Sequence, residues 1–176
     1  AYPWMDESVA AIRRPFGVAD LDAAAGPERF EATIAVQAVS SLEETEELLD
    51  VAATSGRVAG VVGWVDLADP EGTATLAALR DRPGGRALVG VRHQVHDEPD
   101  PDWLLRDRVL DGLATVAAAG LVYDLLVRER ELPAARVVAE RLPELTLVVD
   151  HLAKPRIREG AMEPWAGDLA ALARHP

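Results

Sequence analysis

The sequence predicts an α/β fold built around a parallel sheet, and two observations carry that prediction. Five short runs of mainly Val, Leu and Ala recur along the 176 residues, and each is continuous rather than alternating with polar residues. Such runs are typical of strands that are covered on both faces. Amphipathic segments separate the runs, whose centres lie about 24 to 34 residues apart, as in repeated β-α units with right-handed crossovers. A doubly wound sheet and a (β/α)8 barrel both satisfy this spacing.

The five predicted strands share a second property, which is that each ends in polar residues. They span residues 32–39, 58–66, 87–93, 121–127 and 145–151. The polar side chains at their carboxyl ends are Gln37, Asp66, Arg92, His93, Tyr123, Asp124, Asp150 and His151. In a parallel barrel this end of the strands builds the active site.

The predicted helices carry recognisable end signals. They span residues 42–55, 73–79, 107–119, 132–142 and 165–174. Ser40 or Ser41 is expected to cap the first helix, because a serine oxygen accepts from the free amides of a helix start. Gly120 is expected to end the third helix, and Pro133 suits the first turn of the fourth. The acidic cluster at the start of the first helix (Glu43, Glu44, Glu46 and Glu47) is typical of a solvated helix start, so it is assigned no function.

Composition excludes several classes of function. The chain has 18 basic and 30 acidic residues and a net charge of -12, which argues against nucleic acid and anionic membranes as partners. The chain has no cysteine, which excludes disulfides, thiolate-bound zinc and a thiol nucleophile. We expect one domain over residues 1–176, no signal peptide, no membrane span, a cytoplasmic location and a small-molecule substrate.

Common catalytic and nucleotide-binding motifs do not occur in the sequence. Gly60 and Gly63 lie inside a predicted strand and open no helix, so they do not form a dinucleotide-binding loop. A Walker A loop, a GxSxG elbow and an HExxH pair are also missing from the sequence.

The candidate site residues each allow a structural alternative. Arg92 and His93 adjoin at one strand end, where they would form a clamp for a carboxylate or an oxyanion, although Arg92 would equally pair with one of the many acids. His151 follows an apolar strand and is either functional or a rim histidine, and Tyr123 is either a substrate contact or a core residue. We expect Arg92, His93 and His151 to converge on one pocket, whereas His175 is interpreted as a helix-end cation.

Several ordered motifs resemble the amidohydrolase-related family, and in particular its branch of sugar-acid lactonases. The segment from Gly90 to Asp100, GVRHQVHDEPD, followed by Trp103 and Leu104, resembles a signature of that branch. Further segments resemble the family in the same order, namely 2–5 (YPWM), 36–38 (VQA), 60–67 (GVVGWVDL), 120–126 (GLVYDLL) and 149–155 (VDHLAKP). The resemblance covers essentially the whole chain.

The resemblance implies a (β/α)8 TIM barrel and a hydrolase that opens the lactone of a sugar acid or a related small carboxylic acid. It implies that His151 is catalytic and, if a metal is present, a metal ligand. It implies that Arg92, His93, Tyr123 and Lys154 bind the substrate. Some members of the branch resemble zinc enzymes and others work without a metal, so a divalent cofactor such as zinc and no cofactor both stay open.

The sequence also departs from the family pattern. It lacks the His-x-His pair that the family carries on its first strand. It also lacks the aspartate of the last strand, and in the family that aspartate acts as the general base. We therefore expect an incomplete barrel comprising strands 2–6 and their helices, with two open edges that further chain or a neighbouring molecule covers. Two alternatives stay open, namely a decarboxylase of a small carboxylic acid on the same barrel and a catalytically inactive binding remnant. A homo-oligomer is also left open.

Overall fold

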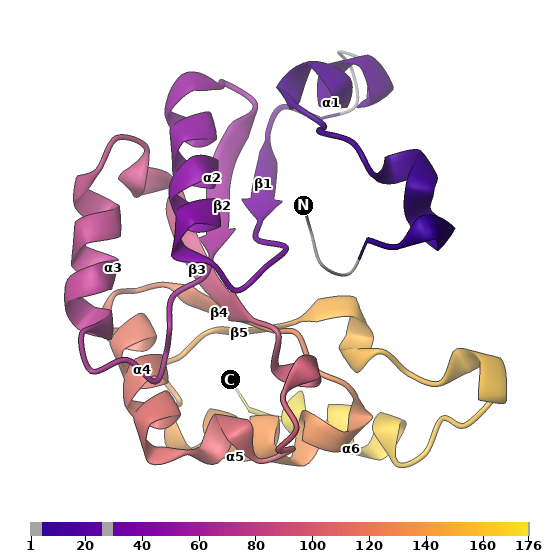
Figure 1. Cartoon of the computed structure of the whole chain (residues 1–176). Coiled ribbons are helices and arrows are strands. Elements are labelled where there is room, and N and C mark those ends of the chain that lie inside the picture. The colour runs from indigo at the N-terminus through magenta and orange to yellow at the C-terminus, as the bar shows by residue number, and fades with distance from the viewer. Residues whose placement is uncertain (1–4, 26–29, 176) are drawn as a thin grey trace.

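The five strands form one parallel sheet in the order in which they occur in the sequence (Figure 1). The computed structural model describes residues 5–25 and 30–175, so most of the predicted YPWM resemblance lies outside the described residues. The strands are β1 (Thr33–Val36), β2 (Val58–Gly63), β3 (Leu88–His93), β4 (Val122–Leu125) and β5 (Leu147–Val149). All four neighbouring pairs are parallel, and the order never reverses as it would in a doubly wound sheet. The sheet curls, as part of a barrel does.

The predicted helices are all present, with small differences at their ends. They are α2 (Leu42–Thr54), α3 (Gly72–Asp81), α4 (Asp107–Ala118), α5 (Leu132–Arg141) and α6 (Trp165–Leu172). Ser41 rather than Ser40 caps α2, since the Ser41 Oγ accepts a hydrogen bond from the Glu44 amide at 3.2 Å. Gly120 follows α4 with φ of 67°, a conformation that glycine adopts without strain.

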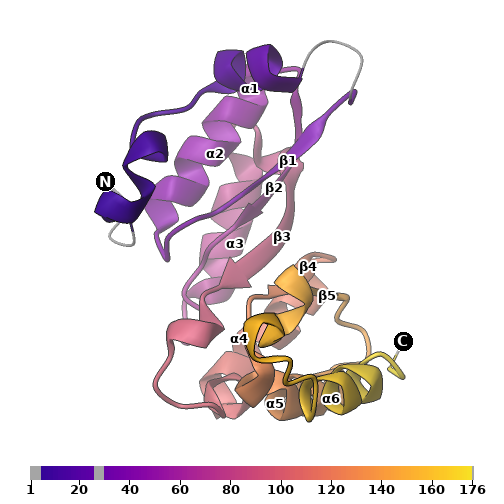
Figure 2. The same cartoon turned by 90° about the vertical axis from the view of Figure 1, so that its right-hand side faces the viewer.

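Sequence reasoning did not predict the helical segments near the amino terminus. Residues Glu7–Ile12 form a 3-10 helix and α1 spans Val18–Ala25, and neither contains a buried residue. Helix α1 lies near one end of β1 and α2 in both views (Figures 1 and 2). Among the described residues, no helix combines the length and the apolar character needed to cross a membrane.

The two faces of the sheet differ in how they are covered. Side chains that point toward the helices are fully buried, including Val61, Val91 and Leu125. On the opposite, concave face, Ile34 is 59% exposed and Val148 is 45% exposed. The continuous apolar runs predict strands that are covered on both faces, and for β1 and β5 the described residues leave the concave face partly exposed. Each of these two strands also pairs on one side only among the described strands.

Helix α4 packs against the loop after β2 through a glycine. A Cβ built on Gly112 would lie 2.2 Å from the carbonyl oxygen of Leu67, which is backbone and cannot rotate away. This contact requires the helix to carry no side chain at that position.

We therefore expect Gly112→Ala to destabilise the fold by about 1–3 kcal/mol, measured by chemical denaturation, because the methyl group forces the helix from the loop. Gly167→Ala in α6 is the matched control, since its Cβ would meet only the flexible Glu163 carboxylate at 3.3 Å. The control should gain about 0.5–1 kcal/mol from the better helix former. Equal effects of the two substitutions would contradict the close contact.

Candidate functional site

One guanidinium connects the carboxyl ends of three strands. Arg92 lies in β3, and its Nη1 donates to Asp150 Oδ2 at 2.6 Å, just after β5. Its Nη2 donates to the backbone carbonyl of Gln37, just after β1. The side chains of Arg92 and Asp150 are 12% and 18% exposed, so the pair is largely shielded from water. Both terminal nitrogens of the predicted substrate-binding arginine are thus engaged by the protein itself.

A network of amides extends from this arginine to the loop after β1. Gln37 is fully buried and donates from Nε2 to the Arg92 carbonyl at 2.9 Å. Gln94 Nε2 donates to Gln37 Oε1 at 3.0 Å, and Ser40 Oγ donates to Gln94 Oε1 at 2.6 Å. These bonds hold the ends of β1 and β3 in a fixed relative position.

Asp124 lies beside Arg92 on the concave face. The strand register pairs Arg92 with Asp124, and Asp124 with Val148 of β5. Asp124 is 7% exposed, and within the described residues its carboxylate makes no hydrogen bond. Burial, followed by the negative charge of Asp150, raises the pKa of Asp124 to about 6, while Arg92 acts in the opposite direction.

Lys154 faces His96 at the same end of the barrel. Its Nζ lies 3.3 Å from His96 Nε2, and His96 Nδ1 lies 3.2 Å from the Leu126 carbonyl. A carbonyl only accepts, so Nδ1 carries the proton and Nε2 is left to accept from the lysine. Burial, followed by the charge of Lys154, lowers the pKa of His96, and this outweighs the carboxylate of Asp97 at 3.2 Å. Burial, followed by the charge of Arg128, lowers the pKa of Lys154.

The segment that carries His151 and Lys154 has an unusual backbone. Four consecutive residues without a glycine, 151–154, have φ between 49° and 55°. Each non-glycine residue in this left-handed region costs about 1–2 kcal/mol, and such conformations cluster at functional sites. The predicted strand over 145–151 therefore ends earlier, at Val149. The His151 side chain is exposed.

His93 lies apart from Arg92, contrary to the prediction of a shared pocket. Consecutive strand residues point to opposite faces, so His93 points toward the helix-covered side. Trp64 Nε1 donates to His93 Nδ1 at 3.0 Å, His93 Nε2 lies 2.8 Å from Glu98 Oε1, and the ring stacks on Trp103 with centroids 4.2 Å apart. Both ring nitrogens are engaged, so neither is available for the predicted substrate contact.

Tyr123 also differs from its predicted position at the pocket rim. It is 0% exposed in the hydrophobic core, which was the structural alternative for this residue. Burial, followed by the nearby charge of Asp124, raises the pKa of its phenol, and its hydroxyl has no hydrogen-bond partner among the described residues. The alternation that buries Tyr123 turns Asp124 toward the concave face.

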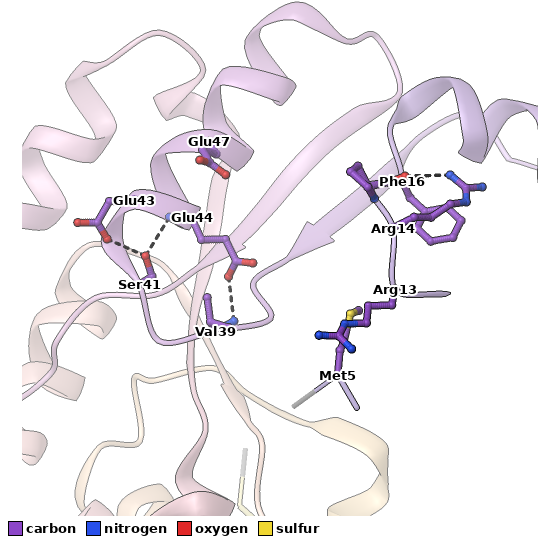
Figure 3. A pocket seen from close by; sticks show the side chains of 10 residues that line it. Met5, Arg13, Arg14, Phe16, Val39, Ser41, Glu43, Glu44 and Glu47 are labelled. Carbon is purple, nitrogen blue, oxygen red and sulfur yellow. Dashed lines mark hydrogen bonds between the residues drawn. The ribbon is translucent and has the colours of Figure 1, made fainter. Parts of the chain in front are cut away.

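A separate cavity of about 870 Å³ lies between the amino-terminal segment and α2 (Figure 3). Its lining includes Arg13 and Arg14 on one side and Glu43, Glu44 and Glu47 on the other. Glu44 Oε2 accepts from the amides of Ala38 and Val39 at 2.8 and 2.9 Å, so this carboxylate serves the turn after β1. The cavity contains none of the predicted site residues.

The chain is similar to known proteins over nearly its whole length. A family model described as Amidohydrolase matches residues 4–176. L-fucono-1,5-lactonase of Burkholderia ambifaria is 39% identical over 98% of the chain, and L-fucono-1,5-lactonase of Burkholderia multivorans is 35% identical over 99%. The chain covers 59% and 60% of the lengths of these two relatives.

Solved structures confirm the fold prediction. The crystal structure of a Burkholderia multivorans amidohydrolase with bound zinc matches 99% of the chain with a TM-score of 0.91 and 34% identity, and the chain covers 61% of it. Amidohydrolase 2 from Bifidobacterium longum subsp. infantis matches with a TM-score of 0.72 and 23% identity, which concerns the fold alone. The five strands are thus part of a TIM barrel.

We expect Arg92→Met to lower the free energy of unfolding by about 2–4 kcal/mol, because it leaves the Asp150 carboxylate shielded from water without its partner. Arg136→Met is the control, since Arg136 forms an exposed pair with Glu140 in α5 and should change stability by less than about 0.5 kcal/mol. Urea denaturation of both variants measures the difference, and a loss at Arg92 no larger than at Arg136 would contradict the structural role.

The raised pKa of Asp124 predicts a pH-dependent stability. Because the folded-state pKa of about 6 exceeds the ordinary value of 3.8, the folded chain binds this proton more tightly than the unfolded chain does. Stability contributed by the neutral carboxyl is therefore complete at acid pH and is lost as the pH rises from about 4 to about 6. At about pH 7.5, Asp124→Asn should stabilise the protein by about 1–2 kcal/mol, after allowance for solvent screening. Urea denaturation at about pH 7.5 and pH 3.5 tests this, and the same gain at both pH values would refute it.

Proposed function

Because the chain belongs to the amidohydrolase family, we propose that the protein hydrolyses the lactone of a sugar acid or a related small carboxylic acid. The observation that carries this proposal is the gathering of Arg92, Asp124, Asp150 and Lys154 at the carboxyl ends of the strands, where barrels of this kind hold their active sites. Two relatives named as L-fucono-1,5-lactonases support the substrate class.

The reaction adds water to a cyclic ester. A water oxygen bonds to the lactone carbonyl carbon, the ring C–O bond breaks, and the ring oxygen leaves as a hydroxyl while the carbonyl becomes a carboxylate and releases a proton. Negative charge develops on the carbonyl oxygen in the transition state, and a positioned cation stabilises it. We call the carboxyl ends of the strands, where Arg92, Asp124, Asp150 and Lys154 lie, the mouth. Lys154 is suited to this role, since its ammonium group lies at the mouth, 3.3 Å from His96 Nε2. His151, which is exposed and lies three residues before Lys154 in the chain, supplies an imidazole that can take or give a proton.

The residues of this chain do not by themselves fit a zinc site. Within residues 5–25 and 30–175, no group of three or more His, Cys, Asp or Glu side chains is arranged to hold a metal ion. Asp150, next to His151, is already engaged by Arg92. The predicted role of His151 as a metal ligand stays a prediction, and no step of the proposed reaction passes through a metal.

The geometry at Arg92 supports hydrolysis over decarboxylation. A decarboxylase would use Arg92 to clamp the substrate carboxylate through its two terminal nitrogens. Those nitrogens donate instead to Asp150 and to the Gln37 carbonyl. A substrate carboxylate would have to displace both partners.

The proposal predicts ring opening of aldonolactones, including L-fucono-1,5-lactone, by the full-length protein. The proton released at each turnover is followed with a pH indicator. His151→Ala should lower kcat/KM by about 100-fold or more, as expected for loss of a general acid–base group. His175→Ala is the matched control, because His175 lies past the end of α6 and is 3.8 Å from Glu140. Failure to open any aldonolactone would refute the proposed function, and equal effects of the two substitutions would show that His151 is misassigned.

A further inference from the structure

The polar groups at the mouth divide into those that the protein has already paired and those that it has not. Both Nη atoms of Arg92 donate hydrogen bonds, one to Asp150 and one to the Gln37 carbonyl. The side chain of Gln37 donates to the Arg92 carbonyl. The Asp124 carboxylate, by contrast, makes no hydrogen bond within the described residues. The Nε of Arg92, the residue paired with Asp124 in the strand register, is also buried without a partner in that part of the chain.

The position of Asp124 is fixed by its strand. Its neighbours in sequence, Tyr123 and Leu125, are both fully buried on the helix side, and β4 pairs with β3 on one side and β5 on the other. The carboxylate therefore cannot turn into the core, and it stays on the concave face at the level of Arg92. It is not needed as the counter-ion of Arg92, since Asp150 fills that role at 2.6 Å.

We propose that Asp124 is a specificity-determining residue, whose carboxylate accepts hydrogen bonds from ligand hydroxyl groups and so favours polyhydroxylated lactones over unsubstituted ones. The inference rests on the proposed lactone hydrolysis and names the group that recognises the substrate class.

The chemistry of the two carboxylates, Asp124 and Asp150, favours hydroxyl donors. An ionised carboxylate has about four acceptor positions and no donor, so it binds hydroxyl groups and repels a ligand carboxylate. Asp150 adds a second negative charge nearby, which strengthens this preference. Asp124 is 7% exposed, and no protein donor occupies its carboxylate within the described residues, so a ligand hydroxyl can bind it and a ligand that lacks the hydroxyl loses that hydrogen bond.

The test compares two lactones with the same six-membered ring. L-fucono-1,5-lactone carries ring hydroxyls and δ-valerolactone carries none, and kcat/KM is measured for both with wild type, Asp124→Asn and Asp111→Asn. Asp111 is an exposed carboxylate of α4 and serves as the matched control. The ratio of kcat/KM for the hydroxylated over the plain lactone should fall about 10- to 100-fold in Asp124→Asn, mainly through KM, as expected for a charged hydrogen bond. The control should keep the wild-type ratio.

A binding measurement separates the inference from the proposed function. Calorimetric titration with L-fuconate and with 5-hydroxypentanoate, the two ring-opened acids, reads the hydroxyl preference without turnover. Loss of the binding preference in Asp124→Asn supports the inference whether or not wild type opens a lactone. Failure of wild type to open either lactone would refute the proposed hydrolysis but not the inference. If Asp124→Asn leaves both the kcat/KM ratio and the binding preference unchanged, the inference is overturned. Ring opening by wild type would still uphold the proposed function in that case. Circular dichroism confirms that the variant is folded.

Discussion

The arrangement of the mouth depends on a single guanidinium. Arg92 reaches from β3 to the residue after β1 on one side and to Asp150 after β5 on the other, so it spans the curled sheet across its carboxyl end. Neighbouring strands in a sheet are already joined by backbone hydrogen bonds, but β1 and β5 are not neighbours. The backbone ladder joins them through β2, β3 and β4, and at the carboxyl ends of the strands Arg92 adds a direct side-chain link between them. Its charge also opposes the repulsion between Asp124 and Asp150.

The fold could be read from the sequence because each strand and most helices leave a local pattern. The run centred on Val62 and the run centred on Gly90 are continuous in apolar residues, and both are parallel strands in the structure. Helix α1 was missed because none of its residues is buried, so no apolar stripe marks it. The partial exposure of Ile34 on the concave face left no signal, since an apolar run indicates that a strand is buried without showing which part of the protein buries it.

The site was less predictable, for reasons that differ from residue to residue. Arg92 and His93 are adjacent in a strand, and the alternation of side chains alone would have placed them on opposite faces. The same alternation would have turned Asp124 toward Arg92 and Tyr123 into the core. The contact between Arg92 and Asp150 joins residues far apart in the chain and leaves no local signal. The left-handed backbone at 151–154 contains no glycine, so the sequence gives no signal for it.

That left-handed segment links the mouth to the outside of the molecule. The indole Nε1 of Trp165, the first residue of α6, donates to the Leu152 carbonyl at 2.7 Å in the middle of the segment. L-residues hold such a backbone only where surrounding contacts enforce it. Helix α6 thus supports the backbone of the segment that carries Lys154, so we expect the geometry of that segment to depend on the packing of this outer helix.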